Sequence, residues 1–281
     1  MQPLRITQSP QDLYRSFLQE QLHIAWHIWR VYFRELTGRK YEPEVKYMDR
    51  FLPVNATVIQ IGASDGRHAF YMARKLNCEM IICFEPSPYT YKILNVLKWL
   101  FRFNQIKTEN LAVGLTPGES YLVTPVKRSG HLGLAFAFVS DVSPDPETID
   151  PARGFDGYLV KPVTMTSIDE YCNQNSIQKL DFIRCDVEGS ELNVLRGARN
   201  SLKRFRPVLL LEVHPHILKN TFGASAQEVW SELEQLDYRM YYLKDNNLEF
   251  TTKFKDEPWR DYFCVPEERI AAFGLLTTRK Q

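Results

Sequence analysis

From residue 57 to residue 214, short apolar segments typical of strands alternate with longer segments typical of helices. The first strand-like segment is TVIQI at 57–61, and the last is PVLLLEVH at 207–214. Parallel strands cannot be joined by a tight turn, and the crossover between them is usually a helix. The alternation therefore predicts an α/β fold in which helices cover both faces of a mostly parallel sheet.

The end of the chain departs from this alternation. After a predicted helix, the segments YRMYYL and DYFCVP have strand-like composition without a convincing helix between them. We expect these two strands to pair antiparallel and to close the sheet. The other predicted strands lie at 57–61, 80–85, 106–113, 120–126, 180–187 and 207–214, and the predicted helices at 67–76, 89–103, 191–204 and 226–236.

Two regions lie outside the predicted sheet. Residues 10–36 carry apolar side chains at helical spacing, so we treat 1–50 as an N-terminal helical extension of a main domain at 51–281. The aromatic residues of this helix suit docking on the main domain, a homodimer interface or contact with a membrane surface. The other region, 127–158, is rich in glycine and proline and is expected to be a loop-rich excursion at the sheet edge.

The charge balance argues against one class of partner. Thirty-five basic and 34 acidic residues give a formal net charge of +1, so no general field attracts a polyanion and no nucleic acid is expected. Five cysteines without a CxxC pair are typical of reduced thiols, and no secretory signal is recognised, so we expect a cytoplasmic protein. The run LHIAWHIW at 22–29 is far shorter than the roughly 20 residues that a spanning helix needs, so no membrane span is expected.

The first predicted strand is followed by GASDG, a short loop between two glycines at 62–66. In an open parallel sheet, ligands bind beyond the carboxyl ends of the strands, where the first strand turns into the first helix. Backbone N–H groups of such a loop, and those of the helix start, can receive a carboxylate or a phosphate. The loop is weak evidence by itself, because any turn from a strand to a helix can need glycine.

Glu85 ends the second predicted strand, 23 residues after Gly62. An acidic side chain at this position can accept hydrogen bonds from both hydroxyls of a ribose. The alternative is an acid that faces water or caps the helix after Pro88. The sequence has no GxGxxG motif, so a compact nucleoside with one charged arm fits better than a dinucleotide with a pyrophosphate.

Six segments, taken in chain order, resemble the FkbM-type family of S-adenosylmethionine-dependent methyltransferases: VIQIGASDG, CFEPSP, NLAVG, TSIDEY, LDFIRCDVEGSELNVLRGA and RPVLLLEVH. The resemblance covers roughly residues 55–215, and DVEGSELNVLRGA is its most specific part. It implies a Rossmann-like class I methyltransferase fold with a seven-stranded, mostly parallel sheet. It also implies methyl transfer from S-adenosylmethionine, usually to a hydroxyl of a small molecule, sugar or glycan.

The resemblance also assigns roles to individual residues. The loop around the methionine part of the cofactor is matched by Gly62, Ala63, Ser64, Asp65 and Gly66. Glu85 matches the ribose-binding acid, Asn110 and Ala112 would lie near the adenine, and Asp186 would lie beside the transferring methyl group. The first-strand position that usually holds an acid is Gln60 here. Gln60 can still accept a hydrogen bond from the cofactor's amino group, but without charge assistance, so weaker cofactor binding is expected.

Four side chains at the ends of two predicted strands are candidates for the chemistry: Asp186, Glu188, Glu212 and His214. A neutral hydroxyl is a poor nucleophile and needs a base within hydrogen-bond reach, or a metal that lowers its pKa. Asp186 is a base, a metal ligand or a group that positions the cofactor. His214 is the other candidate base, with Glu212 as its orienting partner or as a fellow metal ligand. A divalent metal is compatible with these residues but is not required by them.

Other functions fit parts of the sequence. A non-catalytic protein that binds an adenosyl cofactor or another metabolite would keep the loop and Glu85 but lack a working base. A nicotinamide-dependent oxidoreductase would need a pyrophosphate loop, which the chain does not supply. The acceptor is expected to contact the excursion at 127–158, which contains His131, and the N-terminal helix, but neither segment fixes its chemistry.

Overall fold

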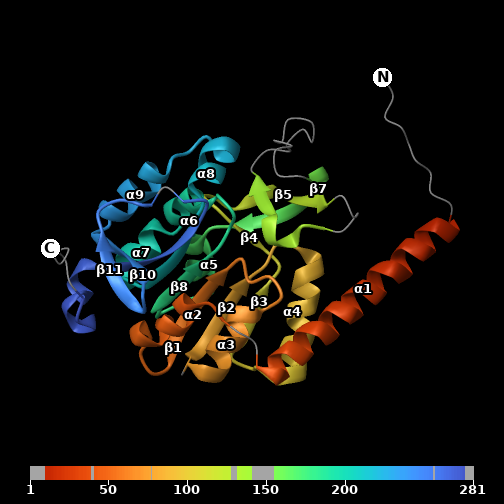
Figure 1. Cartoon of the computed structure of the whole chain (residues 1–281), viewed down its shortest axis with the longest axis horizontal. Helices are drawn as coiled ribbons and strands as arrows, with labels where there is room; N and C mark the ends of the chain where they lie inside the picture. The colour runs from red at the N-terminus through yellow and green to blue at the C-terminus, as the bar shows by residue number, and fades with distance from the viewer. Residues whose placement is uncertain are drawn as a thin grey trace.

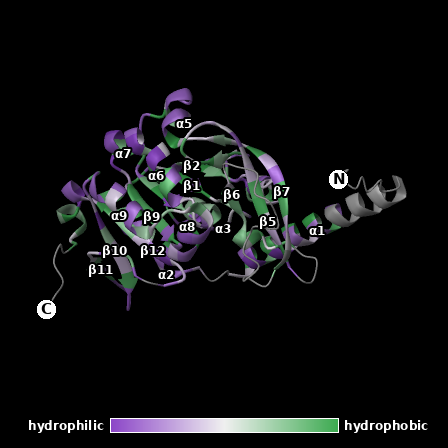
Figure 2. Ribbon diagram, turned by 90° about the horizontal axis from the view of Figure 1, so that it is seen from above, coloured by the Kyte–Doolittle hydropathy of each residue, from purple (hydrophilic) through white to green (hydrophobic). Residues whose placement is uncertain are grey.

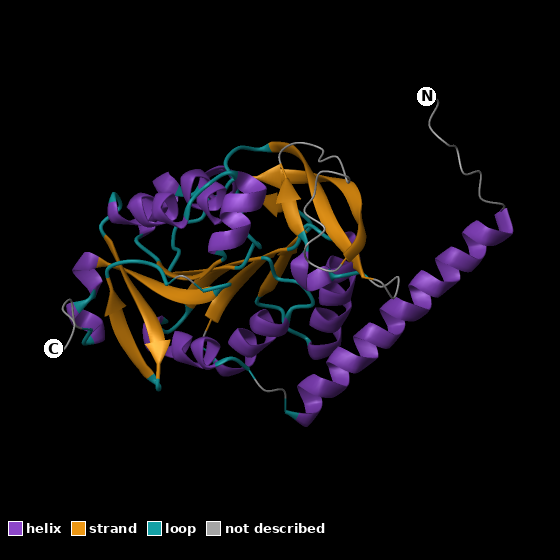
Figure 3. Ribbon diagram, turned by 45° about the horizontal axis from the view of Figure 1, so that its top comes forward, coloured by secondary structure: helices purple, strands orange, loops and turns teal. Residues whose placement is uncertain are grey.

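The architecture is seen in a computed structural model of the chain (Figure 1). It describes residues 10–38, 41–76, 78–127, 132–140, 155–255 and 257–275. Within these residues, the strands form a large sheet of eight strands and a smaller sheet of four. Helices cover both faces of the large sheet, and the small sheet lies beside it (Figure 3).

The large sheet has the strand order β11-β10-β12-β9-β8-β1-β2-β3. Its strands are β1 (Ala56–Ile61), β2 (Cys78–Phe84), β3 (Ile106–Glu109), β8 (Phe182–Cys185), β9 (Val208–Val213), β10 (Tyr238–Lys244), β11 (Asn247–Thr251) and β12 (Arg260–Pro266). The run from β3 to β9 is parallel, whereas β12 pairs antiparallel with both β9 and β10. This confirms the predicted mostly parallel sheet with two closing antiparallel strands.

The eighth strand, β11, was not predicted. It pairs antiparallel with β10 across a two-residue turn, in which Asp245 and Asn246 both have positive φ. Aspartate and asparagine tolerate this left-handed conformation, and such turns match the natural twist of a hairpin. The sheet therefore gains an edge strand beyond the seven that we expected.

The small sheet has the order β4-β7-β5-β6. Its strands are β4 (Ala112–Val113), β5 (Gly118–Lys127), β6 (Phe138–Ser140) and β7 (Phe155–Thr166). We had predicted a strand at 120–126, but not its pairing with β7, which begins inside the predicted excursion. Of that excursion, residues 128–131 and 141–154 lie outside the described residues, and His131 is among them.

Two groups of helices pack on opposite faces of the large sheet. One face is covered by α5 (Ile168–Gln174), α6 (Glu191–Gly197), α7 (Arg199–Phe205), α8 (Pro215–Phe222) and α9 (Ala226–Glu234). The other is covered by α1 (Pro10–Thr37), α2 (Pro43–Tyr47), α3 (Arg67–Lys75), α4 (Pro88–Phe101) and the 3-10 turn η1 (Met48–Phe51). The central strands β1 and β2 are mainly hydrophobic, as expected for a sheet buried on both faces (Figure 2).

The predicted helix at 191–204 is divided into α6 and α7. Both carboxylate oxygens of Asp169, a residue of α5, accept hydrogen bonds from backbone N–H groups at the start of α7, those of Asn200 and Ser201, at 2.9 and 2.7 Å. An acid that caps a helix start satisfies donors that have no partner within the helix. A side chain from another element thus fixes where α7 begins, which local spacing could not show.

Helix α1 docks on the main domain through one side and extends away from it (Figure 1). Ile24 and Val31 are buried there, and the ring of Tyr32 stacks on Phe101 of α4 at 5.0 Å. The division into 1–50 and 51–281 stays a prediction. Val45 and Met48, however, pack in the same hydrophobic cluster as sheet residues.

Candidate active site

The loop after β1 is tied to the two strands that flank it. The backbone N–H groups of Gly62 and Ala63 donate to the carbonyl of Phe84 at 3.0 and 2.9 Å, and that of Asp186 donates to Ile61 at 3.2 Å. Gly62 has a φ of +75°, and a Cβ atom there would collide with the carbonyl oxygen of Asp186. The first glycine is therefore required because the loop packs directly against the end of β8.

Glu85 holds the same loop from the side of β2. Its Oε2 accepts a hydrogen bond from the backbone N–H of Ser64 at 2.6 Å. Its Oε1 accepts from the backbone N–H of Ser87 at 2.9 Å and from the hydroxyl of Thr90 at 2.7 Å. Burial raises the pKa of Glu85, and these hydrogen bonds oppose that shift. The carboxylate thus connects the loop to the start of α4.

One cavity of about 400 Å³ brings the predicted cofactor residues together. Small-molecule sites typically measure ~300–1,000 Å³. Residues 62–65, Glu85, Ala112 and Asp186 line it. Its apolar walls include Phe84, Leu111, Val113, Leu122 and Phe138, so the small sheet closes one side.

Three of the predicted cofactor residues do not line this cavity. Gln60 is wholly buried, and neither atom of its amide has a hydrogen-bond partner among the described residues. Asn110 donates to the backbone carbonyls of Glu85 and Pro86, at 2.8 and 3.2 Å, and thereby holds the strand end. Gly66 has a φ of +88°, and a Cβ atom there would collide with Phe70. The structure thus gives Asn110 and Gly66 roles in shaping the loops around the cavity.

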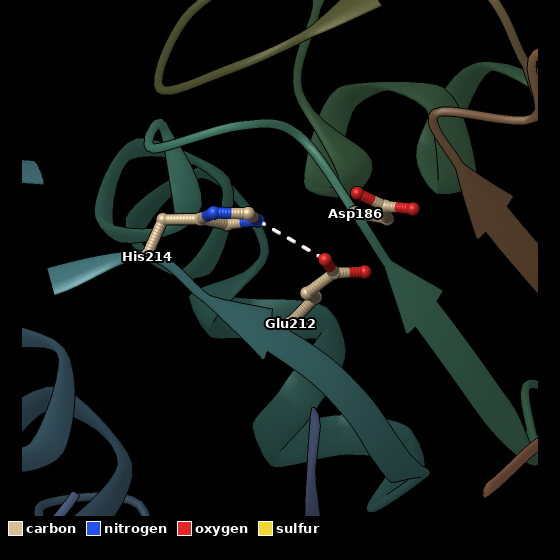
Figure 4. A group of neighbouring side chains, drawn as sticks. All are labelled: Asp186, Glu212 and His214. Carbon is tan, nitrogen blue, oxygen red and sulfur yellow. Dashed lines mark ion pairs between the residues drawn. The ribbon is translucent and has the colours of Figure 1, made fainter. Parts of the chain in front are cut away.

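The four side chains that were candidates for the chemistry lie close together at the ends of β8 and β9, and three of them are drawn in Figure 4. One ligand atom from each of Asp186, Glu212 and His214 lies within 4.8 Å of the other two. Nε2 of His214 lies 3.2 Å from Oε1 of Glu212, and its Nδ1 lies 3.8 Å from Oε2 of Glu188. The four candidates therefore form one cluster, because the strands that carry them are neighbours in the sheet.

Two buried charged residues of this cluster were not predicted as site residues from the sequence. Arg184 donates to Oδ2 of Asp186 at 3.2 Å and lies 3.8 Å from Oε2 of Glu212. Asp261 on β12 pairs in register with Glu212 and is 8% exposed. The available signal was a charged residue inside an apolar strand, since such a side chain is rarely buried without a partner. What the sequence lacked was the pairing of β12 with β9.

Burial and mutual repulsion shift the pKa values of this cluster. Burial raises the pKa of Glu188 to about 8, and the charges of Asp186 and Glu212 add to the shift. Burial likewise raises the pKa of Asp261 to about 8, again with Glu212 and Asp186 adding to it. Burial lowers the pKa of His214, but the contact with Glu212 and the negative charges of Glu188 and nearby acids outweigh this and raise it to about 9.

A second cavity of about 400 Å³ adjoins the cluster. Phe136, Phe155, His214, Ile217 and Pro258 contribute to its lining, so it is largely apolar and aromatic. Glu188, Glu212 and Trp259 line both cavities. The acidic cluster therefore stands where the two cavities meet. Trp259 was not predicted as a site residue.

Comparison with known proteins identifies the family. The model of the methyltransferase FkbM domain matches residues 60–240, well over half of the chain. The chain belongs to the methyltransferase FkbM family. The FkbM match begins on β1 and ends on β10, so it includes the loop, Glu85 and the acids of β8 and β9.

Two curated methyltransferases are distant relatives in sequence. "Methyltransferase 1" of Beauveria bassiana is 20% identical over 150 residues, which are 52% of this chain and 59% of that protein. "Methyltransferase sdnD" of Sordaria araneosa is 24% identical over 161 residues, which are 52% of this chain and 61% of that protein. The chain thus spans about 60% of the length of the curated relatives that it matches.

Comparison with solved structures gives matches of low TM-score and low sequence identity. The methyltransferase FkbM of Methylobacillus flagellatus is 16% identical, with a TM-score of 0.45 over 80% of this chain and 50% of that chain. A putative methyltransferase from Streptococcus mutans, solved with SAH, is 8% identical, with a TM-score of 0.44 over 80% of this chain and 99% of that chain. The family assignment itself rests on the FkbM domain match.

The FkbM assignment confirms the predicted Rossmann-like class I methyltransferase fold and S-adenosylmethionine as its cofactor. The first cavity fits this cofactor in volume and offers apolar walls for an adenine. Glu85 fits with one modification. Three protein donors already occupy its carboxylate, which has about four acceptor sites, so it can accept about one further hydrogen bond and not the two that the resemblance implies.

The described helices were also examined for a segment that could span a membrane, which the sequence did not lead us to expect. Among the described helices of this FkbM protein, none contains a segment that is both long and apolar enough to cross a bilayer.

Proposed function

We propose that the protein transfers a methyl group from S-adenosylmethionine to a hydroxyl oxygen of a small molecule, sugar or glycan. The observation that supports this function is the meeting of the two cavities at the acidic cluster, where Glu188 and Glu212 line both. When bound, S-adenosylmethionine supplies an electrophilic methyl group on a sulfonium. The protein's task is then to align the acceptor oxygen with that methyl group and to remove the hydroxyl proton.

We assign the first cavity to the cofactor and the second to the acceptor. Residues 62–65 would receive the methionine part through backbone N–H groups, and Glu85 would accept from the ribose. Phe136 and Trp259 would hold the apolar part of the acceptor in the second cavity. Asp186, or the neutral form of His214 that its raised pKa makes the minor form at neutral pH, would assist deprotonation of the hydroxyl, with Glu212 orienting His214.

The function is tested by separate binding and transfer measurements. We expect calorimetry to show binding of S-adenosylhomocysteine and no binding of NAD. With methyl-labelled S-adenosylmethionine, we expect label in a hydroxylated acceptor from a panel of sugars, glycans and phenols. Binding of NAD alone would contradict the cofactor assignment. Binding of S-adenosylhomocysteine without transfer to any hydroxyl would instead favour the non-catalytic alternative.

We also propose that the protein forms a homodimer through α1. Its exposed apolar side chains recur at alternating intervals of four and three residues: Leu22, Trp26, Trp29, Phe33 and Leu36. This seven-residue repeat is the spacing along which two helices pair. Ile24 and Val31, on the other side of the helix, are buried against the main domain, so the stripe is free to meet a second copy.

The cytoplasmic location stays a prediction. It is supported by the five cysteines, which are all free, and four of which are buried. Buried free thiols are typical of proteins that reside in a reducing compartment.

A further inference from the structure

We propose that Asp186, Glu212 and His214 bind a divalent metal ion between the two cavities. Two carboxylates and one imidazole contribute ligand atoms that lie within 4.8 Å of one another. The three side chains come from the adjacent ends of β8 and β9 and face a common space (Figure 4). A small ion in that space could contact all three with little movement of the backbone.

A buried nitrogen without a hydrogen-bond partner points to the same ion. His214 is 5% exposed, and its Nε2 has no hydrogen-bond partner among the described residues. The contact with Oε1 of Glu212 is 3.2 Å long but does not satisfy the geometry of a hydrogen bond. Buried polar atoms are nearly always satisfied, and a neutral imidazole nitrogen is the commonest metal ligand. An ion between His214 and Glu212 would displace the imidazole proton that the raised pKa of His214 favours and would satisfy both side chains.

An acid beside the three proposed ligands is also incompletely hydrogen-bonded within the described residues. Asp186, Glu212 and Asp261 lie around the guanidinium of Arg184 in the wall of the first cavity. Oδ1 of Asp261 is buried without a hydrogen-bond partner among the described residues. Buried charges are costly unless they are paired or coordinate a metal. A dication would pair with the carboxylates in place of the protons that their burial favours.

The ligand set indicates the class of metal. Carboxylates suit Mg²⁺ and Mn²⁺, and imidazole suits first-row transition metals, so Mn²⁺ satisfies both kinds of ligand. Three protein ligands leave coordination positions open toward the second cavity. If the proposed function is correct, on which this role rests, the ion would lower the pKa of an acceptor hydroxyl that enters from that cavity.

Metal binding can be measured without any methyl transfer. The full-length protein, treated with EDTA and dialysed, is titrated with MnCl₂, and free Mn²⁺ is followed by its EPR signal. We expect one Mn²⁺ per chain. Asp186→Asn, Glu212→Gln and His214→Ala should each weaken the affinity about tenfold or more. His23→Ala is the control, because this exposed histidine lies on α1 and lines neither cavity, so the Mn²⁺ affinity should stay unchanged.

The outcomes separate the metal site from the proposed function. If the wild-type protein binds no Mn²⁺, Zn²⁺ or Mg²⁺, or if the three variants bind like His23→Ala, the metal site is rejected. Circular dichroism shows whether each variant is folded, and the wild-type titration is decisive even where one is not. Stoichiometric Mn²⁺ binding lost in the three variants supports the site even if no hydroxyl is methylated. Methyl transfer that survives EDTA in protein without Mn²⁺ binding would retain the function and exclude the metal.

Discussion

Glu85 and Gly62 each support the protein's own structure as well as the candidate cofactor site. The carboxylate of Glu85 accepts from two backbone N–H groups and one hydroxyl, and it is 6% exposed. The backbone of Gly62 lies against the backbone of Asp186. A substitution at either position therefore changes the shape of the site and the stability of the fold together.

We expect Glu85→Gln to weaken binding of S-adenosylhomocysteine by about tenfold or more and to lower the free energy of unfolding by about 1–3 kcal/mol. Glutamine keeps one acceptor oxygen but turns an NH₂ group toward the N–H or hydroxyl donors of the loop. Calorimetry and urea unfolding measure the two effects. Glu79→Gln is the control, because Glu79 is exposed near the opposite end of the same strand. An unchanged cofactor affinity would remove Glu85 from the site.

Gly62→Ala should be more damaging than an alanine at another glycine. The positive φ is strained for alanine, and the new Cβ would push the loop away from β8. We expect the free energy of unfolding to fall by about 2 kcal/mol or more, with loss of cofactor binding. Gly118→Ala serves as the control, because a Cβ there meets no atom within 4 Å. Equal stability of the two variants would show that the contact with Asp186 is easily relaxed.

At the scale of elements, α1 presents two different faces. The buried face joins it to the main domain, through Val31 and the stacking of Tyr32 on Phe101. The exposed face carries the stripe defined above, in which Trp29 and Phe33 stack at 5.6 Å and are 61% and 53% exposed. Exposed apolar residues are common singly, but a continuous stripe of them indicates an interface.

The dimer proposal predicts the mass of the particle in solution. Light scattering should give about twice the chain mass of 32.9 kDa for the wild-type protein. Trp29→Glu should give the mass of one chain, because a charge would have to be buried between the two helices. Val54→Glu, which alters an exposed apolar residue outside α1, should stay dimeric. A wild-type mass of one chain at all concentrations would exclude the dimer.

At the scale of the whole molecule, polar side chains from distant parts of the chain meet in the wall of the first cavity. Glu42, which precedes α2, forms an ion pair with Arg67 of α3, and its Oε2 lies 3.2 Å from Nε2 of His68, within hydrogen-bond distance. Glu42, His68 and Arg184 line the cofactor cavity together. Burial lowers the pKa of His68 to about 4, the charges of Arg184 and Arg67 add to the shift, and Glu42 opposes it. This buried histidine is therefore neutral in the folded protein at neutral pH.

This histidine should make stability depend on pH. The unfolded chain takes up a proton near the usual pKa of 6.5, whereas the folded protein does so only near 4. As pH falls from 6.5 to 4, the unfolded state gains protons first, so the free energy of unfolding should fall by up to about 3 kcal/mol. Urea unfolding of His68→Gln should show a flatter dependence in this window, and His216→Gln the wild-type one. Parallel curves for wild type and His68→Gln would contradict the assignment.

The local segments of the fold could be predicted because they depend on neighbours in the sequence. The strands β1, β2, β8 and β9 are short apolar runs, and the glycine loop follows directly from the first of them. Residues that hold the loop and end these strands could be located in the same way, as Glu85 and Asp186 were. The pairing of β5 with β7 could not be predicted, because local composition does not say which strands become neighbours.

The sequence alone determined that this chain forms an α/β methyltransferase fold of the FkbM family type, with a glycine loop and acids at the strand ends. The alternation of apolar segments predicted the α/β class, and the resemblance of six segments to the FkbM-type family implied the methyltransferase fold. Only the tertiary structure showed that Asp261 on β12 pairs in register with Glu212 on β9. It also showed that Arg184 contacts Asp186 and Glu212, the two acids of the proposed metal site. The reason is that burial, charge repulsion and metal geometry depend on distances between strands, which are set when the whole sheet assembles.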